Sequence, residues 1–151
     1  MSQPMRAIVI WQPWASLVVR GFKRYETRSY PCSYRGDLAI IAGRSLEGVA
    51  MMQDDPIGHE MRDLLGVMSL GDLPRGGVVG YARLSGVIAT DAGGHLQVDE
   101  RECRFGNWGP DRFGWEMQAA RVLRAPLAIR GQQGMFTLPE SICDQIRAAA
   151  A

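Results

Sequence analysis

Lys23, Glu26 and Arg28 bring an amine, a carboxylate and a guanidinium close together in the sequence. If residues 25–30 form a strand, Glu26 and Arg28 lie on one face and Thr27 on the other, with Lys23 in the preceding turn. A carboxylate flanked by two cations stays ionised and accepts hydrogen bonds, whereas an arginine fork suits a phosphate or a base edge. The spacing therefore indicates a polar site that could recognise a phosphate or a base.

The same three side chains are also compatible with a ladder of surface ion pairs, which would contribute less than about 1 kcal/mol to stability. Their charges alone favour that interpretation. Lys23 is nevertheless unusual, because it is the only lysine in a chain with sixteen arginines. A lysine at this one position suggests that a compact ammonium group is needed there.

Aromatic side chains could add a stacking surface to such a site. Trp11, Trp14, Trp108 and Phe113 are the candidates, and stacking contributes about 1–3 kcal/mol per base. Trp14 has the spacing of a helix's apolar face, so it is expected in the core. Trp108 lies in a glycine-rich stretch and is expected to be the most exposed. Arg112 is either a phosphate partner or a solvated surface residue.

Composition limits the kind of protein that can carry this site. The chain has 151 residues, of which 46% are hydrophobic and 22% charged, which predicts one globular domain over residues 1–151. No apolar run approaches the roughly 20 residues of a membrane span, and the first residues do not resemble a signal peptide, so we expect a cytoplasmic protein.

Charge is distributed unevenly, although the net charge is only +1. Residues 1–44 hold seven basic and two acidic side chains, whereas residues 45–74 hold one basic and six acidic ones. This pattern is compatible with a local anion-binding face and equally with ordinary uneven surface charge. It argues against a long, uniformly basic groove.

Metal and disulfide chemistry are not expected. Three widely spaced cysteines (Cys32, Cys103 and Cys143) do not form a disulfide framework, and neither histidine, His59 or His95, is closely spaced with a cysteine or with the other histidine. We therefore predict no metal and no cofactor.

Apolar runs and turn residues predict an α+β chain. Strands are expected at residues 7–10, 25–30, 37–42, 78–89, 115–123, 127–129 and 135–138. Helices are expected at residues 12–21, 45–52 and 59–65, and from 139 onward. The unbroken apolar run at 37–42 indicates burial on both faces. Pro56 is expected to interrupt a helical region, Gly80 and Gly86 to mark bulges, and residues 95–114 to form an insertion or lid.

Several short motifs occur in a fixed order. They are Trp11-Gln12-Pro13-Trp14-Ala15-Ser16-Leu17, then Gly21-Phe22-Lys23-Arg24-Tyr25-Glu26-Thr27-Arg28, and Tyr34-Arg35-Gly36. Phe113-Gly114-Trp115, Arg130-Gly131 and Gln133-Gly134-Met135-Phe136 follow. Over most of residues 6–138 the chain resembles the ASCH family (activating signal cointegrator homology), with its QPWA opening and G-x-K-x-x-E-x-R motif.

The resemblance implies a PUA-like fold, a small mixed β-barrel flanked by helices. It also implies a pocket around Lys23, Glu26 and Arg28 that binds RNA, another single-stranded nucleic acid, a nucleotide or a modified nucleoside. Arg35 matches a family position, although it could equally fix its turn. The full set of expected ligand-binding residues is Trp11, Gln12, Lys23, Glu26, Arg28, Arg35, Trp108, Arg112 and Phe113.

Catalysis is the main alternative to binding. The hydrolase branch of the family, which acts on N4-acetylcytidine, has a threonine three residues after the lysine and a glutamate on the strand after the second helical region. Here the threonine position is Glu26, and residues 78–89 contain no acid. Lys23, alone or with Glu26, could still act as the base of a ribonuclease-like or amidohydrolase reaction, although Glu26 favours its charged form. A protein-interaction adaptor is the second alternative.

Overall fold

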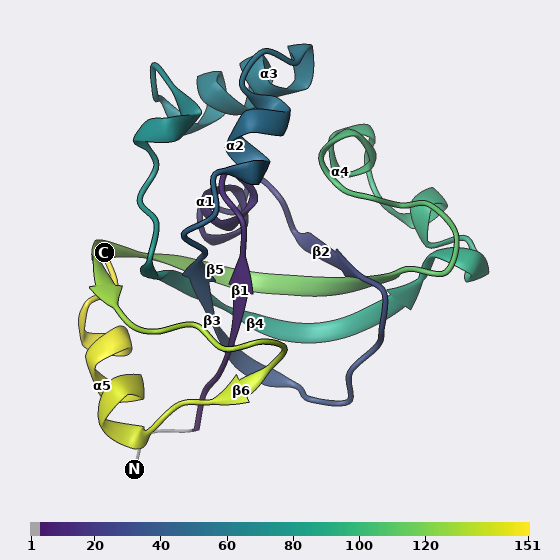
Figure 1. Ribbon diagram of the computed structural model, residues 1–151. Helices are drawn as coiled ribbons and strands as arrows, with labels where there is room; N and C mark the ends of the chain where they lie inside the picture. Colours follow the sequence, from purple (N-terminus) through teal and green to yellow (C-terminus); the bar gives the residue numbers. More distant parts are fainter. Residues whose placement is uncertain (1–3) are drawn as a thin grey trace.

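Two short strands, β1 (Arg6–Ile10) and β3 (Gly36–Ala42), are parallel neighbours in one mixed sheet. The structure is a computed structural model that describes residues 4–151. Residues 1–3 of the predicted domain lie outside the described part. The strand order is β2-β5-β4-β3-β1-β6, and all other pairings are antiparallel. The sheet curls into a half-barrel with helices around it, which confirms the predicted α+β, PUA-like class (Figure 1).

The other four strands within residues 4–151 differ greatly in length. β4 (Gly77–Ala89) and β5 (Phe113–Ala128) are long and curved, whereas β2 (Tyr25–Arg28) and β6 (Phe136–Thr137) are short strands at the two edges. The sequence predicted two separate strands, at residues 115–123 and 127–129, in place of the single strand β5, which was wrong. Pro126 is tolerated there because it lies in a gap of the β4–β5 pairing, between Val122 and Leu127, and β2 pairs only with Phe113–Glu116.

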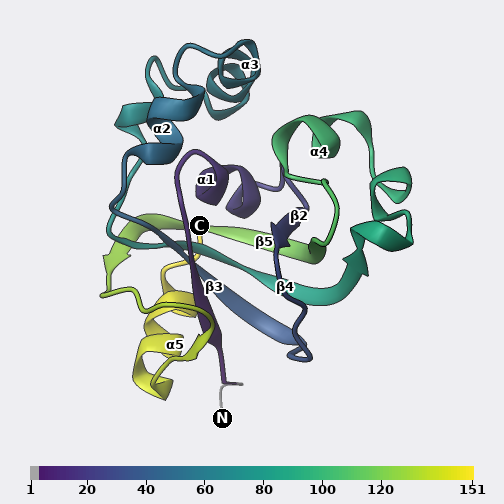
Figure 2. The ribbon, with the colours of Figure 1, turned by 45° about the vertical axis from the view of Figure 1, so that its right-hand side comes forward.

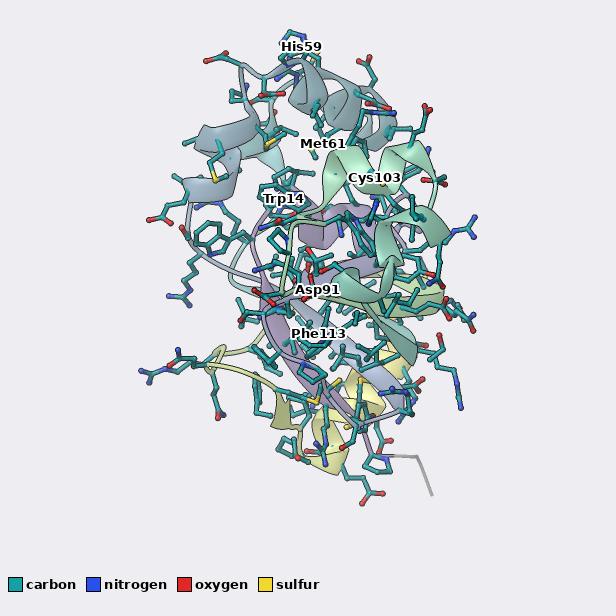
Figure 3. All side chains as sticks on the ribbon, turned by 90° about the vertical axis from the view of Figure 1, so that its right-hand side faces the viewer. Trp14, His59, Met61, Asp91, Cys103 and Phe113 are labelled. Carbon is teal, nitrogen blue, oxygen red and sulfur yellow. The ribbon has the colours of Figure 1, made fainter. Side chains whose placement is uncertain are left out.

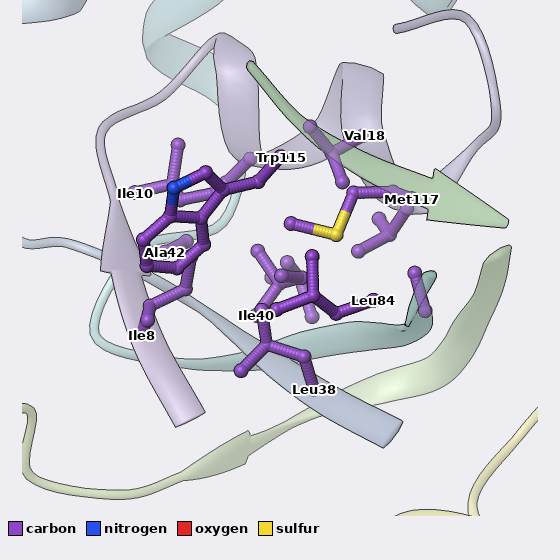
Figure 4. Packing of buried hydrophobic residues seen from close by; sticks show 13 residues of the cluster. Ile8, Ile10, Val18, Leu38, Ile40, Ala42, Leu84, Trp115 and Met117 are labelled. Carbon is purple, nitrogen blue, oxygen red and sulfur yellow. The ribbon is translucent and has the colours of Figure 1, made fainter. Parts of the chain in front are cut away.

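The prediction that β3 is buried on both faces is confirmed. Leu38 and Ile40 pack toward α1 (Trp14–Val19), whereas Ala39 and Ile41 belong to a second cluster beneath α5 (Glu140–Ala148). Figure 4 shows the first cluster, with the Trp115 indole beside residues of β1 and β3. Because successive side chains of a strand alternate in direction, a continuous apolar run supplies both layers.

Gly80 and Gly86 mark irregularities in β4, as predicted. The register with β5 shifts between Val78 and Gly80 and again between Leu84 and Gly86. A Cβ at Gly80 would lie 2.3 Å from the Arg121 carbonyl oxygen. Only glycine therefore allows β4 and β5 to approach each other this closely.

A small lobe follows β3 and contains α2 (Glu47–Met52), α3 (Pro56–Leu65) and a 3-10 turn at Leu70–Asp72. Pro56 begins α3 rather than interrupting a helix. It occupies the first turn, where its missing N–H is not needed, and the Asp55 side chain caps the helix by accepting from Ile57 N at 2.8 Å. Figure 3 shows Met61 on the inner side of the lobe above Trp14, with His59 on its outer side.

The stretch that was expected to be irregular contains a helix, α4 (Glu100–Phe105), preceded by two 3-10 turns at Thr90–Ala92 and Gly94–Gln97. Asp99 caps α4 by accepting from Glu102 N at 2.9 Å, and Phe105 is buried in the cluster under the lobe. Figure 2 shows α4 beside β2, on the same side of the sheet as α1. None of the helices within residues 4–151 is long and apolar enough to cross a membrane.

Candidate functional site

A cleft lies where the end of β1, the start of α1, β2 and the chain after α4 meet. It consists of two adjoining hollows of about 430 and 460 Å³, which share Trp11, Trp14, Glu26, Thr27 and Arg112. We call these two hollows together the cleft. The first hollow reaches Arg28, and the second reaches Lys23. All three residues of the motif therefore line this cleft.

Lys23 lies at the base of the cleft and is only 1% exposed. Its Nζ donates a hydrogen bond to the backbone oxygen of Tyr25. Burial lowers the pKa of Lys23, and this effect outweighs the nearby carboxylates of Glu26 and Glu102, which act in the opposite direction. Lys23 therefore does not belong to a surface ladder. Glu26 favours its charged form, as expected, but burial has the larger effect on its pKa.

Glu26 and Arg28 face the same side of β2 and form an ion pair with a nitrogen–oxygen distance of 3.2 Å. Arg28 Nη2 also donates to the backbone oxygen of Val9 at 2.8 Å, which ties β2 to the end of β1. The Nε atom of Arg28 is buried and has no hydrogen-bond partner within residues 4–151. The guanidinium is therefore fixed in place, and its buried Nε–H donor is unused.

Arg112 approaches the same cleft from the start of β5. Its Nη2 donates to the backbone oxygen of Thr27 at 2.8 Å, and its buried Nε, too, lacks a partner in the described chain. Thr27 lines the cleft beside Glu26, and its hydroxyl accepts from the backbone N–H of Asn107 at 3.2 Å. The two arginines thus lie on the walls of one cleft, each held by a backbone carbonyl.

Two tryptophans form part of the cleft wall. Trp11 is 40% exposed, whereas Trp14 is half-buried and donates its indole N–H to the Phe105 carbonyl at 2.7 Å. Trp14 therefore connects α1 to α4 and packs against the core, as predicted. Trp11 keeps an accessible aromatic surface.

Gln12 and Arg35 do not line the cleft. Gln12 is buried, where its side chain accepts from Ser16 N at 3.0 Å and donates to the Pro74 carbonyl at 2.8 Å, so it fixes the start of α1 against the lobe. Arg35 is exposed and donates to the carbonyls of its own turn at Cys32 and Tyr34.

Trp108 and Phe113 also lie outside the cleft lining. Trp108 is half-buried rather than exposed, because it packs edge-on against Tyr25 at a centroid distance of 5.5 Å and donates to the Glu102 carbonyl at 3.0 Å. Phe113 packs against the core cluster of the sheet. Trp108 consequently anchors the α4 segment to β2 and β5.

Several cleft residues were not foreseen. Asn107 and Arg104 contribute from the chain around the end of α4, and Met51 contributes from the lobe. Glu102, although not part of the lining, accepts from Arg24 N beneath Lys23, and burial raises its pKa. The spacing of Asp99 and Glu102 matches a helix-capping signal that could have revealed α4.

The described lining residues of the cleft carry four basic side chains (Lys23, Arg28, Arg104 and Arg112) against the single acid Glu26. Arg104 is partly neutralised by Glu60 at 2.7 Å. Such a cleft attracts an anion and keeps one carboxylate as an acceptor. Within residues 4–151, no group of three or more histidine, cysteine or acidic side chains gathers as a metal site would require.

A curled mixed sheet flanked by helices, with a basic cleft above β2, defines this as a PUA-like domain. The chain belongs to the ASCH domain family, whose model matches residues 8–124.

The fold is similar to that of solved ASCH structures from Zymomonas mobilis. The crystal structure of that ASCH protein has a TM-score of 0.58 and 15% identity to this chain, covering 97% of this chain and 96% of the other. The crystal structure of a mutant form gives the same TM-score and identity with coverages of 99% and 100%. Among curated proteins, no sequence matched this chain.

Proposed function

We propose that the cleft binds one nucleotide unit of single-stranded RNA. The observation that carries this proposal is the combination of a partly exposed indole, Trp11, with the guanidinium groups of Arg28 and Arg112, whose buried Nε atoms lack partners within residues 4–151. One backbone carbonyl fixes each guanidinium, and the other N–H groups on the cleft wall are available to an acceptor on a ligand.

The chemistry of the cleft suits a nucleotide in three ways. The Trp11 indole offers a face on which a base can stack. Arg28 and Arg112 offer donors for phosphate oxygens, while Glu26 can accept from a base N–H. The volumes of about 430 and 460 Å³ fall in the roughly 300–1,000 Å³ range of small-ligand pockets. ASCH domains are also generally associated with nucleic acids.

Calorimetric titration with the four ribonucleoside 5′-monophosphates tests this proposal. Trp11→Ala should weaken the tightest of these complexes about 5- to 150-fold, because it removes about 1–3 kcal/mol of stacking. Arg112→Ala should also weaken it, by removing charge-assisted hydrogen bonds. Arg124→Ala is the matched control, since Arg124 is exposed on β5 outside the cleft lining. Equal affinity of all four proteins, or no binding by the unaltered protein, contradicts the proposal.

Hydrolysis in the same cleft is a second candidate, and the burial of Lys23 favours it. A lowered pKa increases the fraction of neutral amine, which could accept a proton from water or from a ribose hydroxyl. Turnover of N4-acetylcytidine and of short RNA should then disappear in both Lys23→Ala and Lys23→Arg, because arginine does not deprotonate in proteins. Activity retained by Lys23→Arg excludes the amine as the base, and no turnover by the unaltered protein leaves binding alone.

A further inference from the structure

A third hollow, separate from the two that form the cleft, lies on the other side of the carboxyl end of β1. It measures about 700 Å³ and has an apolar floor made of Val9, Ile41 and Ile129. We call it the arginine hollow, because Arg44 and Arg130 line it as well. It is larger than either part of the cleft, and nothing in the proposed function uses it.

The arginine hollow adjoins the cleft. Val9 lines both, and its backbone oxygen accepts the hydrogen bond from Arg28 in the cleft. Gly43, on the wall of the hollow, lies against Trp11, since a Cβ built on Gly43 would be 3.4 Å from Trp11 Cδ1. A chain-like ligand that stacks on Trp11 therefore reaches the hollow by passing the end of β1.

Glycines make part of the wall. A Cβ at Gly131 would lie 2.7 Å from Val9 Cγ2, and one at Gly43 would lie 3.1 Å from Val9 Cγ1. Gly76 has a φ of +85°, a conformation that other residues rarely adopt. The missing Cβ atoms of Gly43 and Gly131 leave room for the Val9 side chain, so the wall packs directly against the apolar floor.

The charges of the hollow complement a phosphodiester chain. Arg44 and Arg130 are exposed, and neither forms an ion pair within residues 4–151. No acidic side chain of that described part lines the hollow, while Gln132 and Gln133 add amide groups. Two free guanidinium groups beside an apolar floor offer partners for a phosphate and for the face of a base or sugar.

We propose that the arginine hollow binds the nucleotide adjacent to the one in the cleft, on the same RNA strand. This inference rests on the proposed function, because the cleft sets the position of the first nucleotide. Arg44 and Arg130 contact the phosphate of the second nucleotide, and the apolar floor contacts its base or ribose. The protein thus recognises a short single-stranded segment more tightly than a single mononucleotide.

The test compares two probes on three proteins: the tightest-binding ribonucleoside monophosphate and a single-stranded tetraribonucleotide containing it. The proteins are the unaltered chain, the double variant R44A/R130A, and the charge-matched control R83A/R124A, whose residues are exposed and outside both the cleft and the arginine hollow. We expect R44A/R130A to weaken tetranucleotide binding about tenfold or more while mononucleotide affinity stays unchanged. Its plot of log affinity against log salt should also flatten by about 0.7 for each phosphate that the variant no longer neutralises.

The outcomes separate the two proposals. If the unaltered protein binds the mononucleotide and R44A/R130A binds the tetranucleotide as tightly as the control does, the second subsite is overturned and the proposed function stands. Equal affinity of the unaltered protein for both probes overturns it in the same way. If the unaltered protein binds neither probe, the proposed function itself fails.

Discussion

The Lys23 end of the cleft and the arginine hollow hold their cations in opposite ways. Lys23 is buried, bonded to a backbone oxygen and close to two carboxylates, whereas Arg44 and Arg130 are exposed and form no ion pair within residues 4–151. A buried charge depends on its partners and on pH, whereas an exposed charge responds to salt and interacts freely with anions. We therefore expect the cleft to select one chemical group and the arginine hollow to attract anions electrostatically.

Removing the Glu102 carboxylate should have the largest effect on stability, because Glu102 is buried next to the Lys23 end of the cleft. Glu102→Ala leaves the Arg24 backbone N–H without its acceptor and should lower the free energy of unfolding by about 2 kcal/mol. Glu100→Ala, on the exposed face of the same helix, should change it by less than about 0.5 kcal/mol. Urea unfolding of both variants measures the difference. Equal losses would mean that α4 does not hold the base of the cleft.

Lys23 should make stability depend on pH. Its pKa in the folded chain lies below the ordinary value of 10.5, so between the two values the unfolded chain binds more protons and stability rises with pH. Lys23→Met removes this group while keeping a side chain of similar length. The free energy of unfolding of the unaltered protein should therefore rise relative to Lys23→Met as pH increases from 7 toward 10. A constant or falling difference contradicts the burial effect, and R44A, which alters an exposed cation, should show no such trend.

Replacing Trp108 should have a smaller effect, on the free energy of unfolding and not on nucleotide affinity. Trp108→Phe removes the hydrogen bond to the Glu102 carbonyl and should cost about 1 kcal/mol, while the ring still packs against Tyr25. Because Trp108 does not line the cleft, mononucleotide affinity should remain unchanged in calorimetric titration. Lost affinity at unchanged stability would instead support its expected role as a stacking platform.

The local parts of the site were predictable because they depend on strand periodicity. Glu26 and Arg28 share a face of β2, as a two-residue repeat requires, and Gly80 and Gly86 mark the irregularities of β4. The family motif also pointed to Lys23, which lines the cleft.

The burial of Lys23 and Trp108 could not be predicted, because it depends on contacts between segments that are remote in sequence. Lys23 is buried partly because α4 packs beside it, where Glu102 accepts from Arg24 N, and Trp108 is held by Tyr25, more than eighty residues earlier in the chain. The capping pair Asp99 and Glu102 was the local signal for α4, but its position over β2 follows from packing that no short pattern encodes. The arginine hollow, too, arises only when residues 129–133 fold back beside β1.

The central claim is that a nucleotide stacks on Trp11, and the four tryptophan indoles allow a direct test. The indole N–H groups of Trp14, Trp108 and Trp115 each donate to a backbone carbonyl, whereas Trp11 has no such partner within residues 4–151. Proton–nitrogen correlation NMR during titration with the ribonucleoside monophosphates follows all four N–H signals, and Trp11→Phe assigns one of them. We expect the Trp11 signal to shift most, with a saturating dependence on nucleotide concentration. A saturating shift of another indole while the Trp11 signal stays fixed, or no shift at all, would contradict the account.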